Sequence, residues 1–345
     1  MIKNIIHKLL LRHHFWRYAT FSELAELYTS NMLRALACNL FSIFIPIYLL
    51  KNGYSVPAIS IYYCFYFVVR IFGDVLSGYA VARIGPKHTW FLSHFSNILN
   101  LFCLLLLPSQ PWLFFISAAT NALGTSFQFI PLHVDFSKIK HVEHNGKEQS
   151  FFTILEKVGA AIGPVIGGFI AASYGAGYAI GGSIVIYGAS LIPLLMTPEP
   201  VITHQHIRFR GFPYKKVWRD ILAHTARGVD MTVTAGMWPL FLVIVIFQSS
   251  QYQSVGTITT ISILIAIAAT YVFGIIIDKK HSLRFLRVSV IVDSLLYVCR
   301  FLSTSFGAAI ATNVANEAAY TGVTMAFNKG MYDAVDDLPG YRIVY

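Results

Sequence analysis

Long apolar segments constrain this chain more than any other feature of its sequence. A helix that crosses a lipid bilayer needs about 20 mostly apolar residues, and about ten segments meet that requirement. Hydrophobic residues make up 56% of the chain and charged residues only 12%, too few to cover a water-exposed surface of this size. The sequence therefore predicts an all-α integral membrane protein. The predicted spans are 29–50, 56–80, 89–108, 111–133, 151–173, 177–197, 229–249, 255–277, 285–304 and 306–327.

The net charge of +10 is distributed as expected for such a protein. Of the 26 Lys and Arg residues, 21 fall in the N-terminal segment, the even-numbered connections and the tail, whereas the odd-numbered connections contain only Lys51. Because basic connections resist translocation, they stay in the cytoplasm. We therefore expect a multi-pass protein of the cell membrane (inner or plasma) with a cytoplasmic N-terminus. The positive charge gives no indication of nucleic-acid binding.

The longest polar stretch, 198–228, separates six predicted spans from four. We expect a cytoplasmic N-terminal segment (1–28), a six-helix N-terminal half (29–197), a cytoplasmic linker (198–228) and an incomplete C-terminal half of four helices plus a tail (229–345). Within the linker, apolar residues recur at helical spacing beside basic residues, which predicts an amphipathic helix along the membrane surface. The apolar positions are Tyr214, Val217, Trp218, Ile221 and Leu222.

The connections after the second and eighth spans resemble each other. Each begins with Gly, continues with three residues and a small or acidic residue, and then has a cation. They occupy equivalent positions in the two halves, as expected of a duplicated transporter. The matching residues are Gly78, Arg83, Gly85 and Lys87 in the first copy, and Gly274, Asp278 and Lys279 in the second.

The fifth span contains a run of regularly spaced glycines, from Gly159 to Gly168, with a proline inside it. Glycines four residues apart allow another backbone to approach closely, and a proline loosens the helix locally. We therefore expect Gly163, Pro164 and Gly167 to form a close helix contact that takes part in conformational change.

These motifs resemble two signatures of the major facilitator superfamily, Gly-x-x-x-Asp-Arg-x-Gly-Arg-Arg/Lys and Gly-x-x-x-Gly-Pro-x-x-Gly-Gly. The resemblance implies that the loop motif latches neighbouring helices on the cytoplasmic side. Ala82 stands where the family has Asp, and we expect Asp74 to substitute because it lies four residues from Arg70, at ion-pair spacing. Since the family has twelve spans, we expect this chain to be a fragment that lacks the last two, the alternative being a natural ten-span variant.

The resemblance also implies a solute cavity lined by spans one, four, seven and ten. Polar groups are costly in lipid, so polar residues inside these spans are the candidates for the cavity lining. For Arg34 two readings stay open, binding of an anionic group or extension toward the membrane surface. The cavity candidates are Asn31, Arg34, Asn39, Asn121, Thr125, Gln128, Thr234, Trp238, Asn313, Asn316 and Glu317.

Glu317 lies near the middle of the tenth predicted span. A lone carboxylate there could load and release a proton, so we predict Glu317 to be the proton-coupling site. The alternative is a carboxylate permanently paired with a cation, such as Arg34 across the cavity or Arg300 nearby. Pro239 should interrupt the seventh span.

Two further pairs of charged residues lie inside predicted spans. Asp293 and Arg300 share one face of the ninth span, and we expect them to pair with a neighbouring helix. We expect Glu156 and Lys157, in the fifth span, to join the latch around the second connection.

The predicted function is secondary active transport of a small solute by alternating access, coupled to protons. The alternative is a transporter-like sensor or scaffold that moves no solute. No motif for phosphate binding, metal-dependent hydrolysis or a nucleophilic serine occurs, so we expect no enzyme activity, cofactor or metal. The expected partners are the solute, H+ and the lipid bilayer, with the protein acting as a monomer.

Overall fold

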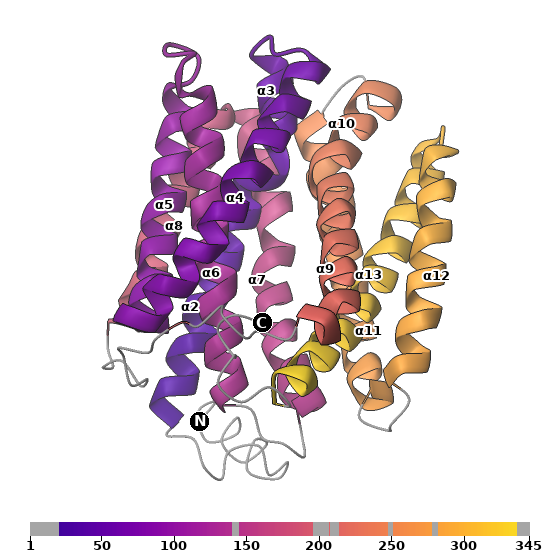
Figure 1. Cartoon of the computed structure of the whole chain (residues 1–345). Coiled ribbons are helices and arrows are strands. Elements are labelled where there is room, and N and C mark those ends of the chain that lie inside the picture. Colours follow the sequence, from indigo (N-terminus) through magenta and orange to yellow (C-terminus); the bar gives the residue numbers. More distant parts are fainter. Residues whose placement is uncertain are drawn as a thin grey trace, which may run out of the picture.

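The computed structural model describes residues 21–139, 145–195, 207, 214–247, 251–277 and 282–336, and all of its regular structure is helical. The helices pack side by side, and most of their axes are close to parallel (Figure 1). The first six long helices are α2 (Phe21–Phe41), α4 (Val56–Ile84), α5 (Pro86–Leu106), α6 (Leu113–Ile139), α7 (Asn145–Ser173) and α8 (Ala176–Leu194). The short η1 (Ser42–Phe44) and α3 (Ile45–Lys51) extend α2.

The remaining elements come after the long polar stretch of the sequence. They are α9 (Tyr214–Thr232), η2 (Val233–Met237), α10 (Trp238–Phe241), η3 (Leu242–Ile246), α11 (Gln251–Ile276), α12 (Ser282–Phe301) and α13 (Phe306–Asp336). The two η segments are π-helical turns on either side of α10, which starts with Trp238 and Pro239. A proline cannot donate its backbone hydrogen bond, so the predicted interruption of the seventh span by Pro239 is confirmed.

Seven described helices are long and apolar enough to cross a membrane. They correspond to the first six predicted spans and the eighth, with ends that differ by a few residues, at Tyr28–Lys51, Val56–Ile84, Pro86–Leu106, Leu113–Val134, Phe152–Ser173, Ala176–Leu194 and Gln251–Ile276. The other predicted spans are also helical, as α9 to η3, α12 and α13, and they lie alongside the seven in Figure 1. They contain several charged residues, which lower their apolar content: Arg227, Asp230, Asp293, Arg300 and Glu317.

The amphipathic helix predicted within the linker is the first part of α9. It continues past residue 228 to Thr232 and directly into η2, so it forms one helical segment with the seventh span. Val217 is buried, whereas Tyr214, Trp218, Ile221 and Leu222 are exposed. In Figure 1, α9 rises along the other helices and is not a separate helix on the surface of the bundle.

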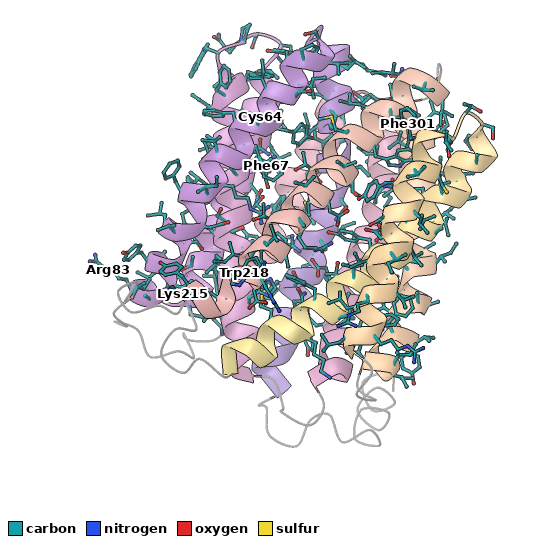
Figure 2. All side chains as sticks on the ribbon, turned by 45° about the vertical axis from the view of Figure 1, so that its right-hand side comes forward. Cys64, Phe67, Arg83, Lys215, Trp218 and Phe301 are labelled. Atoms are coloured by element: carbon teal, nitrogen blue, oxygen red, sulfur yellow. The ribbon has the colours of Figure 1, made fainter. Side chains whose placement is uncertain are left out.

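Large apolar side chains cover the outer surface of the bundle. Phe72, Val185, Leu295 and Phe301 are among those that are exposed, whereas serine, asparagine and threonine side chains are buried between the helices. This distribution suits lipid, because lipid solvates apolar side chains and leaves polar groups to find partners inside the protein. Figure 2 shows Phe301 on this surface, and shows Arg83, Lys215 and Trp218 toward the opposite end of the bundle.

Helix α7 lies between two sets of helices. On one side it packs against α2 and α8, and on the other against α11, which also contacts α13. Figure 1 shows the same arrangement, with α2, α4, α5, α6 and α8 on one side of α7 and α11, α12 and α13 on the other.

The glycines of α7 allow both contacts. A Cβ atom on Gly163 would lie 2.7 Å from the carbonyl carbon of Asn39 in α2, and one on Gly168 would lie 2.5 Å from the carbonyl oxygen of Tyr252 in α11. Both separations are shorter than real Cβ contacts, so only glycine fits at these positions. The close helix contact predicted for this motif is therefore present. Pro164 lies inside α7 without ending the helix.

Candidate functional site

Charged side chains meet where α7 packs against its neighbours. Arg34 of α2 is buried, and its Nη2 atom donates a hydrogen bond to Oε1 of Glu156 at 2.7 Å. Its Nε atom donates to Oδ1 of Asn31 at 3.1 Å. Arg34 is thus held inside the bundle by a carboxylate, and the reading in which it extends toward the membrane surface is wrong. Because Glu156 pairs with Arg34, its predicted place in the latch is not seen.

The next residue of α7 makes an ion pair to the distant end of the chain. Nζ of Lys157 lies 2.7 Å from Oε1 of Glu317 in α13, a residue 160 positions away. The two side chains keep only 15% and 22% of their exposure. Glu317 is therefore paired with a cation, as the alternative reading of the sequence expected, although this cation is neither Arg34 nor Arg300. The premise of a lone carboxylate at Glu317 is wrong.

A second cluster surrounds Asn313 of α13. Its Oδ1 atom accepts hydrogen bonds from Nε1 of Trp238 at 2.8 Å and from Nη2 of Arg300 at 2.7 Å, and its Nδ2 atom donates to Oγ of Ser262 at 2.7 Å. The guanidinium carbon of Arg300 also lies 4.4 Å from the ring centre of Trp238, a cation–π distance. One amide therefore joins α10, α11, α12 and α13.

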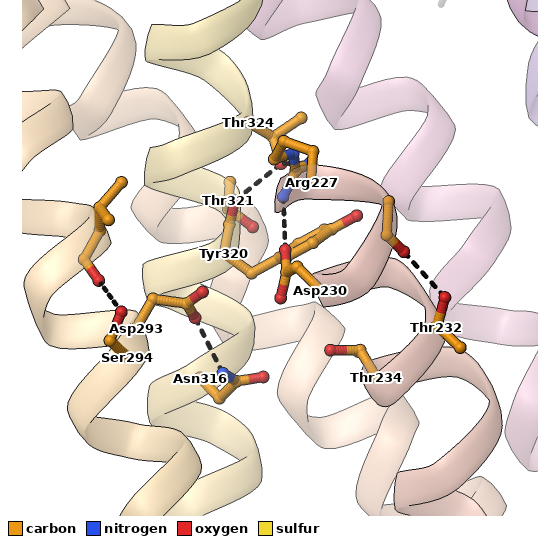
Figure 3. Close-up of polar contacts among 12 residues, drawn as sticks. Arg227, Asp230, Thr232, Thr234, Asp293, Ser294, Asn316, Tyr320, Thr321 and Thr324 are labelled. Carbon is orange, nitrogen blue, oxygen red and sulfur yellow. Dashed lines mark hydrogen bonds and ion pairs between the residues drawn. The ribbon is translucent and has the colours of Figure 1, made fainter. Parts of the chain in front are cut away.

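A third cluster joins α9, α12 and α13 (Figure 3). Arg227 lies 2.7 Å from a carboxylate oxygen of Asp230 and also donates to Oγ1 of Thr324 at 2.7 Å. The other Asp230 oxygen accepts a hydrogen bond from the hydroxyl group of Tyr297, which lies 2.7 Å from Oγ1 of Thr234. Arg227 lies in the predicted cytoplasmic linker, 198–228, but in the structure it pairs with residues of the bundle.

Beside this cluster, Asp293 of α12 accepts a hydrogen bond from Asn316 of α13. The distance from Nδ2 of Asn316 to Oδ1 of Asp293 is 2.8 Å, and Figure 3 shows the two side chains meeting between their helices. Asp293 and Arg300 thus each bond to α13, the neighbouring helix, as expected from their shared face. Their partners are asparagines instead of opposite charges.

The polar stripe of the fourth span lies apart from these clusters. Oγ1 of Thr125 accepts a hydrogen bond from the hydroxyl group of Tyr66 in α4 at 3.0 Å and donates to the carbonyl oxygen of Asn121 at 2.9 Å. Gln128 is buried one turn further along α6. In α2, Asn39 donates to the carbonyl oxygen of Ala35 at 2.9 Å. Thr125 thus bonds to α4 and to its own helix, whereas Asn39 bonds within α2.

The first copy of the loop motif forms the turn between α4 and α5. Gly85 separates the two helices with a φ angle of +88°, a conformation that side chains other than glycine rarely adopt. Gly78 and Lys87 are buried, whereas Arg83 is exposed. Of the second copy, Gly274 is buried in α11, and Asp278 and Lys279 lie outside the described residues.

The ion pair predicted one turn before this loop is present. Nε of Arg70 lies 3.8 Å from Oδ2 of Asp74, at the helical spacing of four residues. The spacing alone was enough to predict it, because residues four apart share one face of a helix.

Several residues of these clusters were not among the predicted site residues. Glu156, Lys157, Arg227, Asp230 and Tyr297 supply a large part of the charge and hydrogen bonding. For four of them the signal was an ionisable group inside or at the end of an apolar segment. Tyr297 gave no such signal, since tyrosine is common in membrane helices.

Comparisons with known proteins agree with this architecture. Residues 27–335 match the family model described as Major Facilitator Superfamily. The fold is similar to that of FucP, a transporter of this superfamily solved in the outward conformation, with a TM-score of 0.61 and 13% sequence identity over 92% of this chain and 93% of that one. It is also similar to the human organic anion transporter MFSD10 (TETRAN), with a TM-score of 0.65 and 11% identity over 90% and 85% of the two chains.

A third similar structure is that of a D-xylose-proton symporter, with a TM-score of 0.57 and 14% identity over 94% of this chain and 87% of the other. No match was found among curated protein sequences. The structural matches show a shared fold, whereas the family model covers most of the sequence itself. The chain therefore belongs to the Major Facilitator Superfamily, and it is an integral multi-pass membrane protein of a family of transporters, not of enzymes.

Proposed function

We propose that this protein moves a small solute across the membrane by alternating access and that a proton gradient drives the movement. In this proposal 29–197 and 229–345 act as two halves that rock against each other, with 198–228 as a cytoplasmic linker. The observation that carries the proposal is the ion pair between Lys157 of the first half and Glu317 of the second.

The two halves contact each other at both ends of the bundle. At the end near α3, the rings of Phe44 and Tyr252 lie 5.6 Å apart, and Nζ of Lys51 lies 4.3 Å from the Tyr252 ring centre. Toward the other end, Met331 of α13 packs against the apolar cluster that contains Phe152 of α7. These contacts support a conformation in which a solute site between the halves would be closed toward both sides.

Lys157 and Glu317 lie between these two ends, where a charge change would act on the packing of the halves. Protonation of Glu317 would remove the negative charge that attracts Lys157. Since a buried ammonium group without a carboxylate is costly, the neutral Glu317 would favour separation of α7 from α13. A proton could thus open one side of the protein, which makes Glu317 our proposed coupling residue.

Three of the predicted cavity residues fit this scheme as solute ligands. Asn31 of α2 bonds to Arg34, and Asn313 of α13 bonds to Trp238 of α10, so these amide and indole groups between the helices would be available to form hydrogen bonds with a polar solute. The glycine contacts of α7 would let the halves pivot, because close backbone packing without bulky side chains allows small rotations. The loop around Gly85 would limit the opening on the cytoplasmic side.

The test is transport by purified protein in liposomes with an imposed pH gradient. Initial probes are D-xylose, a nucleoside and a small organic anion, which cover neutral and anionic solutes. We expect at least one probe to accumulate when the outside is acidic. The Glu317→Gln variant should still exchange that probe downhill but should not accumulate it. Glu156→Gln is the matched control, because this carboxylate pairs within the first half.

Accumulation by Glu317→Gln equal to that of the wild type would exclude Glu317 as the coupling residue. If no solute moves while one of the probes raises the thermal stability of the protein, the alternative of a sensor or scaffold would replace transport.

A further inference from the structure

One buried arginine stands out because it lacks an acidic partner in contact with it. Arg34, Lys157 and Arg227 each lie 2.7 Å from a carboxylate oxygen. Arg300 of α12 is 4% exposed, yet within the described part of the chain no carboxylate oxygen lies within ion-pair distance of its guanidinium group. A buried cation without a close counter-charge is costly, and more so inside a membrane.

Most of the hydrogen-bonding capacity of Arg300 is also unused. A guanidinium group has five N–H donors and no acceptor. Nη2 of Arg300 donates to Oδ1 of Asn313 at 2.7 Å, whereas Nε and Nη1 are buried and have no hydrogen-bond partner. These two nitrogen atoms carry most of the N–H groups of the side chain. Arg300 therefore lacks both acceptors and a close negative charge, and an anionic ligand would supply both.

The acidic groups near Arg300 do not fill this role. Glu317 of α13 and Asp230 of α9 each form an ion pair with another cation. Asp293 lies on the same helix as Arg300 but seven residues earlier, about 10 Å along the helix axis, and it bonds to an asparagine of α13. The three carboxylates act on the charge of Arg300 from a distance, but none of them accepts a hydrogen bond from it.

Aromatic rings hold the guanidinium group of Arg300 in place. Its central carbon lies 4.4 Å from the ring centre of Trp238 in α10 and 5.8 Å from that of Tyr297 in α12. An aromatic ring attracts a cation but does not neutralise it. Trp238 also lies between the two π-helical turns, and such turns are frequent at functional sites. The guanidinium group is thus positioned without losing its charge.

We propose that Arg300 binds an anionic group of the transported solute, a carboxylate or a phosphate, through the nitrogen atoms that have no partner in the described conformation. A guanidinium group forms charge-assisted hydrogen bonds with such oxyanions, and these bonds are about twice as strong as those between neutral groups. The anion also supplies the close counter-charge that the protein itself does not provide. No covalent bond is made or broken.

This inference rests on the proposed transport function and narrows its solute to an anion. The sequence predicts Asn313 and Trp238 as cavity residues, and both of them contact Arg300. The anion would therefore bind beside residues of the seventh and tenth spans, with its charge recognised from the ninth. A neutral sugar would leave the guanidinium group without a close counter-charge.

The test is thermal unfolding of the purified protein in detergent, with inorganic phosphate and succinate as probes. D-xylose is the neutral control, and sodium chloride at equal ionic strength is the control for salt. At several times its dissociation constant, phosphate or succinate should raise the melting temperature of the wild type by about 2–4 °C, and the two controls should not.

The rise in melting temperature should disappear in Arg300→Met. It should be smaller in Arg300→Lys, which keeps the charge but loses the planar fork of donors. Arg219→Met is the matched control, because it removes a cation that is exposed on α9, and it should respond like the wild type. Without any probe, Arg300→Met should not lower the melting temperature, since it removes a buried cation that has no close counter-charge.

A wild type that responds to neither anion would overturn the proposal, as would a full response in Arg300→Met. Should Arg300→Met fail to fold, an undiminished response in Arg300→Lys would overturn it. The measurement needs no flux. An anion response that depends on Arg300 in a protein that moves no probe would leave this site in place while rejecting transport, whereas uptake of D-xylose alone would support transport and reject the anion site.

Discussion

Replacement of Lys157 and Glu317, singly and together, tests whether their ion pair holds the two halves in contact. Lys157→Met leaves a carboxylate without its partner, and Glu317→Gln leaves an ammonium group without its partner. Removing one member of a fully buried pair costs about 3–5 kcal/mol. Here the side chains keep 15% and 22% exposure, so solvent lowers the cost, and we expect about 2 kcal/mol.

The lost stabilisation affects only the conformation in which α7 and α13 are in contact. Because about 1.4 kcal/mol corresponds to a factor of ten, the ratio of closed to open protein should fall about 30-fold in each single variant. The double variant buries no unpaired charge, so it should return toward the wild-type ratio. The two changes are then strongly non-additive, as expected for residues in direct contact.

The assay is a distance distribution between spin labels at two exposed positions on the same end of the bundle. Ile84 is the last residue of α4 and Leu283 is the second residue of α12, and both side chains are exposed. The labels require replacement of the native cysteines, which are Cys38, Cys64, Cys103 and Cys299. Each single variant should add a population at longer distance, and the double variant should lose most of it.

Glu156→Gln is the control, since it removes a carboxylate from the adjacent position of α7 but breaks a contact with α2 within the first half. Its distance distribution should match that of the wild type. If the effects of Lys157→Met and Glu317→Gln simply add in the double variant, the pair does not hold the halves together and the reasoning fails.

Three further predictions concern the packing of the helices. Gly163→Leu should lower the melting temperature in detergent, because even a Cβ atom there would lie 2.7 Å from the carbonyl carbon of Asn39, whereas Gly188→Leu, with open space around it, should not. Gly85→Ala should destabilise the protein by about 1–2 kcal/mol, because its φ of +88° strains any other residue, and chemical denaturation would detect this. Asn313→Leu should lower the free energy of unfolding by about 2–4 kcal/mol, because it removes the acceptor of two buried donors, one of them charged. It should also shift the fluorescence of Trp238, and an unchanged emission would contradict the hydrogen bond from the Trp238 indole.

The sequence alone was sufficient for the class of protein and for the positions of its helices. The length and apolar content of a span are local properties, so they can be read without knowing what the span touches. The same holds for the ion pair between Arg70 and Asp74, whose spacing follows from helix geometry. The glycines of the fifth span predicted a close contact but not that α2 and α11 would share it.

The partners of the interior charges were decided by the tertiary structure. Glu156 and Lys157 are neighbours in sequence, yet they point from α7 toward different helices and bind Arg34 and Glu317. Helical periodicity tells which residues share a face of one helix, but not which helix faces them. Asp293 shows the consequence most clearly. In the sequence it lies seven residues from Arg300 on the same helical face. Only the packing of α12 against α13 shows that both side chains form hydrogen bonds with asparagines of α13.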